Sequence, residues 1–243
     1  MKAIVTGHAR GLGAAIAEEL LSRNIAVLGL ARHRQAALEA RFPALLEQVE
    51  IDLADTAALA RWLAGGALRR FAADAGDGGL LLVNNAGTVQ PVAPLGAQDP
   101  ERIAQAVSLN VAAPLMLADA ATAARTAGGL RILHVSSGAA QSPYAGWSVY
   151  CATKAALDQH ARAAALDNAP GVRICSLAPG VIDTGMQAEI RATPLENFPS
   201  RERFDGLKRD GQLTAPEEAG RRLVDFLLGS QFGREPVADL RRS

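Results

Sequence analysis

The beginning of the chain constrains the fold most strongly. The apolar residues 3–5 lead directly into T-G-H-A-R-G-L-G at residues 6–13, and an amphipathic helix pattern follows over 14–23. A strand, a glycine-rich turn and a helix in this order are typical of a phosphate-binding site. The glycines let the backbone approach a ligand, and the start of the helix offers free N–H groups. The spacing is G-x-x-x-G-x-G rather than the common G-x-G-x-x-G, so a plain tight turn is the alternative.

The same alternation continues along the chain. Apolar runs at 25–30, 49–53, 80–83, 130–135 and 172–177 read as strands buried on both faces, as in parallel sheets. Helix patterns cover 35–41, 57–73, 101–125, 149–167 and 216–228, and the tail from 236 holds at most one short edge strand. We therefore predict one α/β domain over residues 1–243. Residues 183–216, with three prolines and two short helical pieces, are predicted to form a substrate lid, with an ordinary variable connection as the alternative.

Composition excludes several classes of protein. The formal net charge is zero and aromatic residues make up 4% of the chain, which argues against a nucleic-acid surface. No apolar run approaches a membrane span of about 20 residues, and the N-terminus enters a strand pattern without a signal peptide. The two cysteines suggest no disulfide framework, so we expect a cytoplasmic protein. The histidines lack metal-ligand spacing, so no metal site is expected: His8, His33, His134 and His160.

Tyr150 and Lys154 are the candidate catalytic pair. They are four positions apart in a helix pattern, so both side chains lie on one face. A phenol has a pKa of about 10, and a nearby ammonium is expected to lower it. Ser137 follows the strand-like run 130–135 and can place a second hydrogen-bond donor beside the phenol. Alone, Y-x-x-x-K is a weak signal, and an ordinary helix face is the alternative.

Two arginines favour a dinucleotide that carries a 2′-phosphate. An acidic residue that holds a ribose 2′-OH usually follows the second strand, but this chain has Arg32 there. Arg10 in the glycine turn adds a second cation, so the pair favours a 2′-phosphate, unless both are solvated loop residues. Asp52 is expected to accept a bond from an adenine amino group or to begin a helix cap. N-N-A-G at 84–87 ends a strand, which is where ligands bind in open α/β sheets.

Three further residues bear on the chemistry. Asn110 is mildly unfavourable in the middle of a helix and indicates a local kink or a polar task. Cys151 points about 100° away from Tyr150 around the helix, which argues against a thiol nucleophile. The serine before Ser137 does not create the G-x-S-x-G pattern of hydrolases.

Taken in order, T-G-x-x-x-G-x-G, N-N-A-G, a central Asn, S-x(12)-Y-x-x-x-K and P-G-V resemble the short-chain dehydrogenase/reductase family along the whole chain. Within it, the chain is most similar to the branch of sepiapterin reductases and bacterial benzil reductases. The resemblance implies a Rossmann-like α/β/α sandwich with a parallel, mostly seven-stranded sheet in the order 3-2-1-4-5-6-7. It implies an NADPH-dependent carbonyl reductase that acts on a 1,2-dicarbonyl or a pterin-like ketone.

The resemblance also assigns roles. Tyr150 would be the general acid, Ser137 would polarise the carbonyl, and Lys154 would lower the phenol pKa and bond the nicotinamide ribose. Asn110 would hold a water that links Lys154 to solvent. Arg32 would bind the 2′-phosphate. The residues expected to contact NADP(H) are Gly7, Arg10, Gly11, Leu12, Gly13, Arg32, Asp52, Leu53, Asn85, Ala86, Gly87, Tyr150, Lys154, Pro179, Gly180, Val181 and Thr184.

The substrate residues are predicted from their position beside these motifs: Tyr144, Trp147, Met186 and Gln187. Aromatic side chains there suit a planar or aryl dicarbonyl. Asp239 is the nearest candidate for the acidic residue that anchors pterin in sepiapterin reductases, although an exposed tail charge is the favoured interpretation. The helices at 101–125 and 149–167 are expected to pack across a two-fold axis, so that the chain forms a homodimer or homotetramer. A non-enzymatic NADP-binding, redox-sensing module on the same fold is the alternative function, and the complete catalytic set argues against it.

Overall fold

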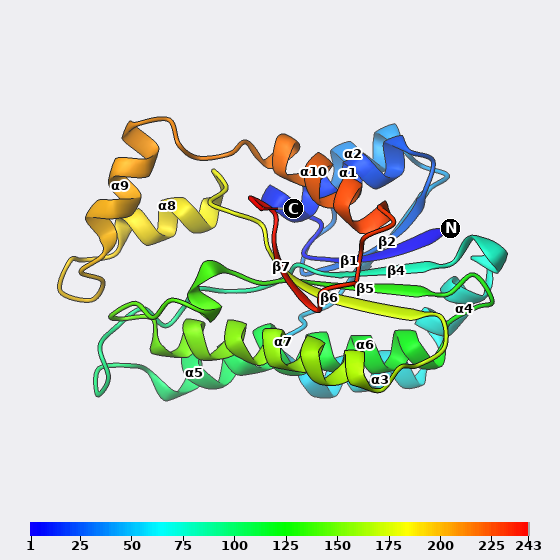
Figure 1. Ribbon diagram of the computed structural model, residues 1–243, viewed down its shortest axis with the longest axis horizontal. Helices are drawn as coiled ribbons and strands as arrows, with labels where there is room; N and C mark the ends of the chain where they lie inside the picture. The colour runs from blue at the N-terminus through cyan, green and yellow to red at the C-terminus, as the bar shows by residue number, and fades with distance from the viewer. Residues whose placement is uncertain (243) are drawn as a thin grey trace.

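The computed structural model describes residues 1–242, and seven parallel strands form one sheet in the order β3-β2-β1-β4-β5-β6-β7 (Figure 1). The predicted fold and strand order are confirmed. The strands are β1 (Lys2–Thr6), β2 (Ala26–Ala31), β3 (Leu46–Glu50), β4 (Leu80–Asn84), β5 (Leu130–Val135), β6 (Val172–Ala178) and β7 (Val237–Asp239).

Two helical layers cover the sheet (Figure 1). One layer holds α1 (Gly11–Ser22), α2 (Ala36–Arg41) and α10 (Pro216–Leu228). The other holds α3 (Thr56–Ala64), α4 (Ala67–Ala73), α5 (Pro100–Val107), α6 (Ala113–Ala123) and α7 (Ser148–Leu166). The two remaining helices, α8 (Gly185–Ala192) and α9 (Arg201–Arg209), extend beyond the carboxyl ends of the strands.

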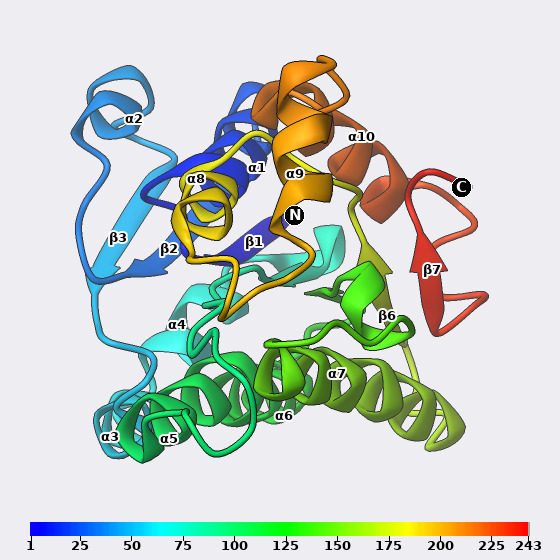
Figure 2. The ribbon, with the colours of Figure 1, turned by 90° about the vertical axis from the view of Figure 1, so that its left-hand side faces the viewer.

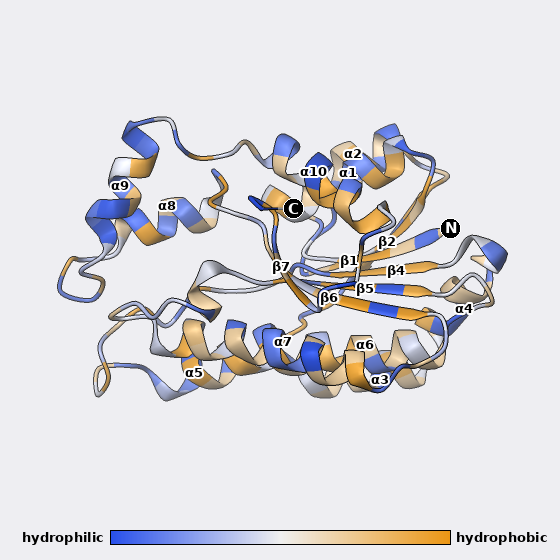
Figure 3. Ribbon diagram, in the orientation of Figure 1, coloured by the Kyte–Doolittle hydropathy of each residue, from blue (hydrophilic) through white to orange (hydrophobic). Residues whose placement is uncertain are grey.

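The central strands are apolar on both faces, which explains their continuous hydrophobic runs (Figure 3). Val5 pairs with Val83, and both side chains join the core beneath α1 and α10. Their neighbours Ile4 and Leu82, also paired, join the opposite core beneath α3, α6 and α7. Each buried aliphatic side chain of this kind stabilises the fold by about 1.5–3 kcal/mol. The sheet is therefore a rigid platform for the residues at its edge.

Three element boundaries differ from the prediction. The helix predicted over 57–73 breaks at Gly65 and Gly66, where Gly66 adopts a left-handed φ of 74°. The helix predicted over 101–125 is interrupted by a π-helical turn, Ser108–Ala112. Pro114 follows this turn and has no N–H to donate, which removes one α-helical bond where the turn forms. The third strand begins earlier than predicted, because Leu46 pairs with Val27.

Residues Pro100–Ala123 form a helical run that is long and apolar enough to cross a membrane by length and composition, contrary to the expectation from the sequence. Four side chains of its second half nevertheless pack into the core beneath the sheet: Ala113, Leu117, Ala118 and Ala121. Burial of this kind is what a core helix shows, so the run is weak evidence for a membrane span.

Candidate active site

The ends of β1 and β4 are tied together where the chain connections diverge to opposite faces of the sheet. The Thr6 hydroxyl accepts hydrogen bonds from the backbone N–H groups of Asn85 and Ala86, both at 2.9 Å. The Asn85 amide in turn donates to the Thr6 carbonyl at 3.0 Å. Figure 2 views the molecule from this end. A crevice at such a topological switch point is the usual ligand site of open α/β sheets.

The glycine-rich turn is shaped to hold an anionic ligand. Gly7 and Gly11 adopt φ values of 70° and 55°, which other residues rarely do. A Cβ at Gly13 would lie 2.1 Å from the Gly7 carbonyl oxygen, so only glycine fits there. Helix α1 starts without a side-chain cap and without an acidic residue in its first turn. Its free N–H groups therefore suit the diphosphate of a dinucleotide.

A cavity of about 780 Å³ runs from this turn to the helices α8 and α9. The structure brings together all but two of the residues predicted for the site. Those on the cavity wall are Gly7, Arg10, Gly11, Leu12, Gly13, Arg32, Asp52, Leu53, Asn85, Ala86, Gly87, Ser137, Tyr144, Trp147, Tyr150, Lys154, Pro179, Gly180, Val181, Thr184, Met186 and Gln187. Asn110 and Asp239 lie outside the wall.

One end of the cavity is basic. Arg10 and Arg32 both line it, whereas the neighbouring Arg34 turns to a salt bridge with Glu39. Asp52 also lines this end, and its side chain accepts a bond from the backbone of Ala54. The cap of α3 is Asp55. The interpretation of Asp52 as a helix cap is therefore wrong, and its place on the cavity wall fits the other interpretation, contact with a base.

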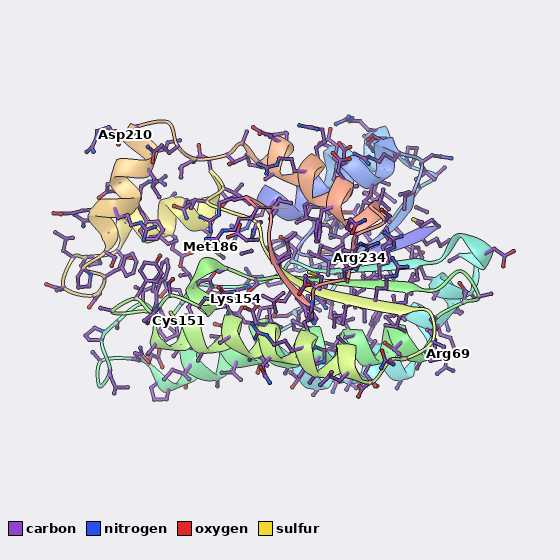
Figure 4. All side chains as sticks on the ribbon, in the orientation of Figure 1. Arg69, Cys151, Lys154, Met186, Asp210 and Arg234 are labelled. Carbon is purple, nitrogen blue, oxygen red and sulfur yellow. The ribbon has the colours of Figure 1, made fainter. Side chains whose placement is uncertain are left out.

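Tyr150, Ser137 and Lys154 meet beyond the glycine turn. The Ser137 hydroxyl lowers the pKa of the Tyr150 phenol, and Ser137 follows the end of β5. Lys154 is buried, donates to the Val135 carbonyl at 2.8 Å, and its nitrogen lies 5.7 Å from the centre of the Tyr150 ring. Figure 4 shows Lys154 on α7 and Met186 on α8 at the same end of the sheet.

Burial controls the protonation of this pair. It raises the pKa of Tyr150 to about 12, against the opposing effect of the Ser137 hydrogen bond. It lowers the pKa of Lys154 to about 8, against the opposing effect of Asp158. The expectation of a lowered phenol pKa is thus wrong: the pKa of Tyr150 is raised, because desolvation outweighs the effect of Ser137. At neutral pH the site offers a protonated phenol beside an ammonium.

Asn110 supports the wall from behind. Its amide donates to the Thr88 carbonyl at 2.8 Å and to the Thr153 hydroxyl at 3.1 Å, while its oxygen accepts from the Thr88 N–H at 2.9 Å. The π-helical turn places the side chain, which confirms the predicted local irregularity at this residue. Both hydrogens of the Asn110 side-chain amide are donated to protein acceptors. Its role with a bridging water stays a prediction.

Aromatic residues line the other end of the cavity, and Phe198 packs against them. Trp147 stacks on Phe198 with ring centres 4.4 Å apart, and it meets the Tyr150 ring edge-on at 5.3 Å. Tyr144 and Phe204 pack on the same group. Sequence reasoning missed Phe204 and its neighbour on α9, Leu207, which both line the cavity. Their spacing of three residues in the predicted helical piece was the available signal.

The C-terminal tail contributes an arginine to the cavity wall. Arg241 lines the cavity, and Asp239 accepts three hydrogen bonds from its guanidinium. This pairing lowers the pKa of Asp239. Arg203 of α9 also lines the cavity and donates to the Tyr144 hydroxyl at 3.0 Å. Residues 1–242 contain no cluster of His, Cys, Asp or Glu that could hold a metal ion.

Comparison with known proteins agrees with this geometry. Residues 1–195 match the family model described as short chain dehydrogenase. The chain belongs to the short chain dehydrogenase family. Benzil reductase ((S)-benzoin forming) of Bacillus cereus is 32% identical, covering 96% of both chains. Sepiapterin reductase of Meriones unguiculatus is 32% identical, covering 94% of this chain and 92% of that one. The predicted family and branch are confirmed.

Solved structures of short chain dehydrogenases share the architecture. A short-chain dehydrogenase/reductase from Burkholderia vietnamiensis is 51% identical, covers 99% of this chain and 96% of its own, and superposes with a TM-score of 0.72. A short chain dehydrogenase from Burkholderia cenocepacia J2315, solved in complex with NADP, is 29% identical with a TM-score of 0.76, covering 97% of this chain and 94% of its own. The chain is thus a nicotinamide-dependent oxidoreductase by family.

Proposed function

We propose that the protein is an NADPH-dependent carbonyl reductase that acts on a 1,2-dicarbonyl or a pterin-like ketone. The observation that carries the proposal is that Ser137, the buried phenol of Tyr150 and the Lys154 ammonium meet on one cavity wall. Similarity to benzil and sepiapterin reductases supports this choice of substrate class. A cavity rich in aromatic side chains supports a planar substrate.

The residues of the wall fit NADPH. The free start of α1 suits its diphosphate, and Arg10 with Arg32 suits the 2′-phosphate. The relative that was solved with NADP supports the same cofactor. When bound, NADPH supplies a hydride, that is, the two electrons of the reduction. Replacing both arginines with alanine should weaken NADPH binding more than NADH binding, and an unchanged ratio of the two dissociation constants would contradict the assignment.

Tyr150 and Ser137 both donate hydrogen bonds to the carbonyl oxygen in the proposed reaction. As the carbonyl carbon gains hydride, the oxygen becomes an alkoxide, which is a far stronger base than a phenolate, so the Tyr150 proton moves to it. A ketone becomes an alcohol, and the phenolate left on Tyr150 is stabilised by the Lys154 ammonium. Solvent then returns the proton.

The test is NADPH consumption with benzil as the probe. Tyr150→Phe removes the acid and should lower kcat by about 10²–10⁴, while NADPH still quenches protein fluorescence. Cys151→Ser, one residue further along α7, serves as the control for disturbance of the helix. Full activity of Tyr150→Phe would exclude the assigned acid. Tight NADP binding with no turnover of any carbonyl would instead favour a redox-sensing module.

The assembly proposed for the enzyme is a homodimer or homotetramer. Val107 on α5 is 45% exposed and Leu166 on α7 is 81% exposed. Both lie on the helices predicted to pack across a two-fold axis. Light scattering at micromolar concentration should give at least twice the mass of the chain, and a monomeric mass would contradict the proposal. We also propose a cytoplasmic location, since Cys151 and Cys175 are unpaired.

A further inference from the structure

Behind the active site lies a buried carboxylate that the reaction above does not use. Asp158 of α7 is 3% exposed. Its Oδ1 atom accepts hydrogen bonds from the hydroxyls of Ser136 and Ser176, both at 2.7 Å. A charged side chain is rarely buried unless an opposite charge compensates it. Both of these partners are neutral, so the compensation comes from elsewhere.

Lys154 lies one helical turn before Asp158, on the same face of α7. It too is buried, at 4% exposed, and its ammonium is bonded to a neutral group, the Val135 carbonyl. Two opposite charges are therefore buried one turn apart, and each has neutral hydrogen-bond partners. Coulomb attraction between them favours the charged form of Lys154, because protein rather than water surrounds both.

The other titratable groups packed against this pair do not compensate either charge at neutral pH. On α7 the phenol of Tyr150 is protonated. On β5 burial lowers the pKa of His134 to about 3, and burial lowers that of its partner His160 as well. On β6 burial raises the pKa of Cys175 to about 12, and the negative charges of Asp158 and of Glu235 in the tail add to this.

Asp158 also fixes the backbone beside the catalytic serine. Its bond to Ser136 holds the residue immediately before Ser137, at the end of β5. Its bond to Ser176 holds β6, the next strand of the sheet. One oxygen thus links the catalytic helix to two strand ends.

We propose that Asp158 is a positioning residue for the reduction: its buried carboxylate keeps Lys154 in the ammonium form and holds Ser137 against Tyr150. The inference rests on the proposed function, because the charge on Lys154 matters when Tyr150 gives up its proton. The balance of forces on Lys154 supports it. Burial lowers the pKa of Lys154 to about 8, and Asp158 is the group that opposes the shift. Without Asp158 the lysine would lose its charge nearer to neutral pH.

Asp158→Asn tests the charge alone, because the amide oxygen can still accept both serine hydroxyls. The alkaline limb of the kcat profile, measured with NADPH and benzil, should move about one unit toward lower pH. Near pH 8 kcat should fall about fivefold, since the charged fraction of Lys154 drops from about one half to about one tenth. Near pH 6 it should match the wild type. A purely structural role would lower kcat at every pH.

Ser176→Ala is the matched control. It removes one of the two hydrogen bonds and keeps the carboxylate, so its alkaline limb should stay in place. A Ser176→Ala profile shifted as far as that of Asp158→Asn would overturn the proposal, and so would an unshifted Asp158→Asn profile.

A second readout does not need turnover. The chain has three lysines, Lys2, Lys154 and Lys208, so ¹³Cε-labelled lysine gives three NMR signals, and Lys154→Arg identifies the one of interest. Its titration midpoint should fall by about one unit in Asp158→Asn. An unmoved midpoint would overturn the proposal even if the variant is inactive. Should the wild type reduce no carbonyl, the proposed function fails, and this titration still decides whether Asp158 controls the charge of Lys154.

Discussion

The hydrogen bonds of Asn110 allow a quantitative prediction about stability. Asn110 is 1% exposed, and its side chain pairs with both the N–H and the carbonyl of Thr88. Asn110→Leu would fill much of the space but leave both backbone groups unpaired. Each such group costs about 1–3 kcal/mol, so the free energy of unfolding should fall by about 2–6 kcal/mol. The free energy of unfolding of a whole domain is about 5–15 kcal/mol, so the effect is large.

Asn110→Ala should cost less than Asn110→Leu, because the space left by the amide can admit a water that rebinds Thr88. The assay is equilibrium unfolding in urea, followed by the fluorescence of Trp62 and Trp147. Thr153→Val, which removes a single partner of Asn110, is the control and should cost about 1 kcal/mol. An Asn110→Leu variant within about 1 kcal/mol of the wild type would refute the reasoning.

Three further results are expected. Gly13→Ala places a Cβ 2.1 Å from the Gly7 carbonyl oxygen, so NADPH should bind at least about tenfold more weakly in a fluorescence titration; unchanged affinity would contradict the proposed cradle. Arg131→Met removes two bonds, at 2.6 and 2.8 Å, to carbonyls at the end of α10, and urea unfolding should show a loss of about 2–3 kcal/mol. The folded-state pKa of Tyr150 is raised from 10.0 to about 12, so its stabilising contribution is complete below the unfolded value and is lost as pH rises through this window. Between these two pKa values the free energy of unfolding of the wild type should fall by on the order of 2 kcal/mol relative to that of Tyr150→Phe. Parallel curves of stability against pH would contradict the raised pKa.

The sequence predicted the sheet and most of the site because both depend on local patterns. Both faces of the sheet are covered, so the apolar runs marked the central strands. The residues predicted to contact the cofactor follow strand ends, and parallel strands bring those ends to one edge. Helix α10 was predicted at its observed bounds, because Pro216 begins it and Gly229 follows it.

The features of the site that the sequence did not predict depend on contacts between distant segments. The phenol pKa of Tyr150 was predicted in the wrong direction, because the sequence shows the neighbouring cation but not the burial. Asp239 was considered as a substrate anchor, yet its partner Arg241 is the one on the cavity wall. Arg203 reaches the cavity from α9, and only the fold of residues 183–216 could show this. The lid role of that segment stays a prediction.

The stack of Trp147 on Phe198 has a consequence for any attempt to broaden the range of substrates that the protein reduces. Phe198 belongs to the segment between α8 and α9, whereas Trp147 directly precedes the first turn of α7 and touches Tyr150. Phe198 is fully buried and does not itself line the cavity, so a smaller residue there would loosen Trp147 and, through it, the packing of the Tyr150 ring. The predicted substrate residue Trp147 and the predicted acid Tyr150 share one set of aromatic contacts, so directed evolution at Phe198 should change selectivity and turnover together.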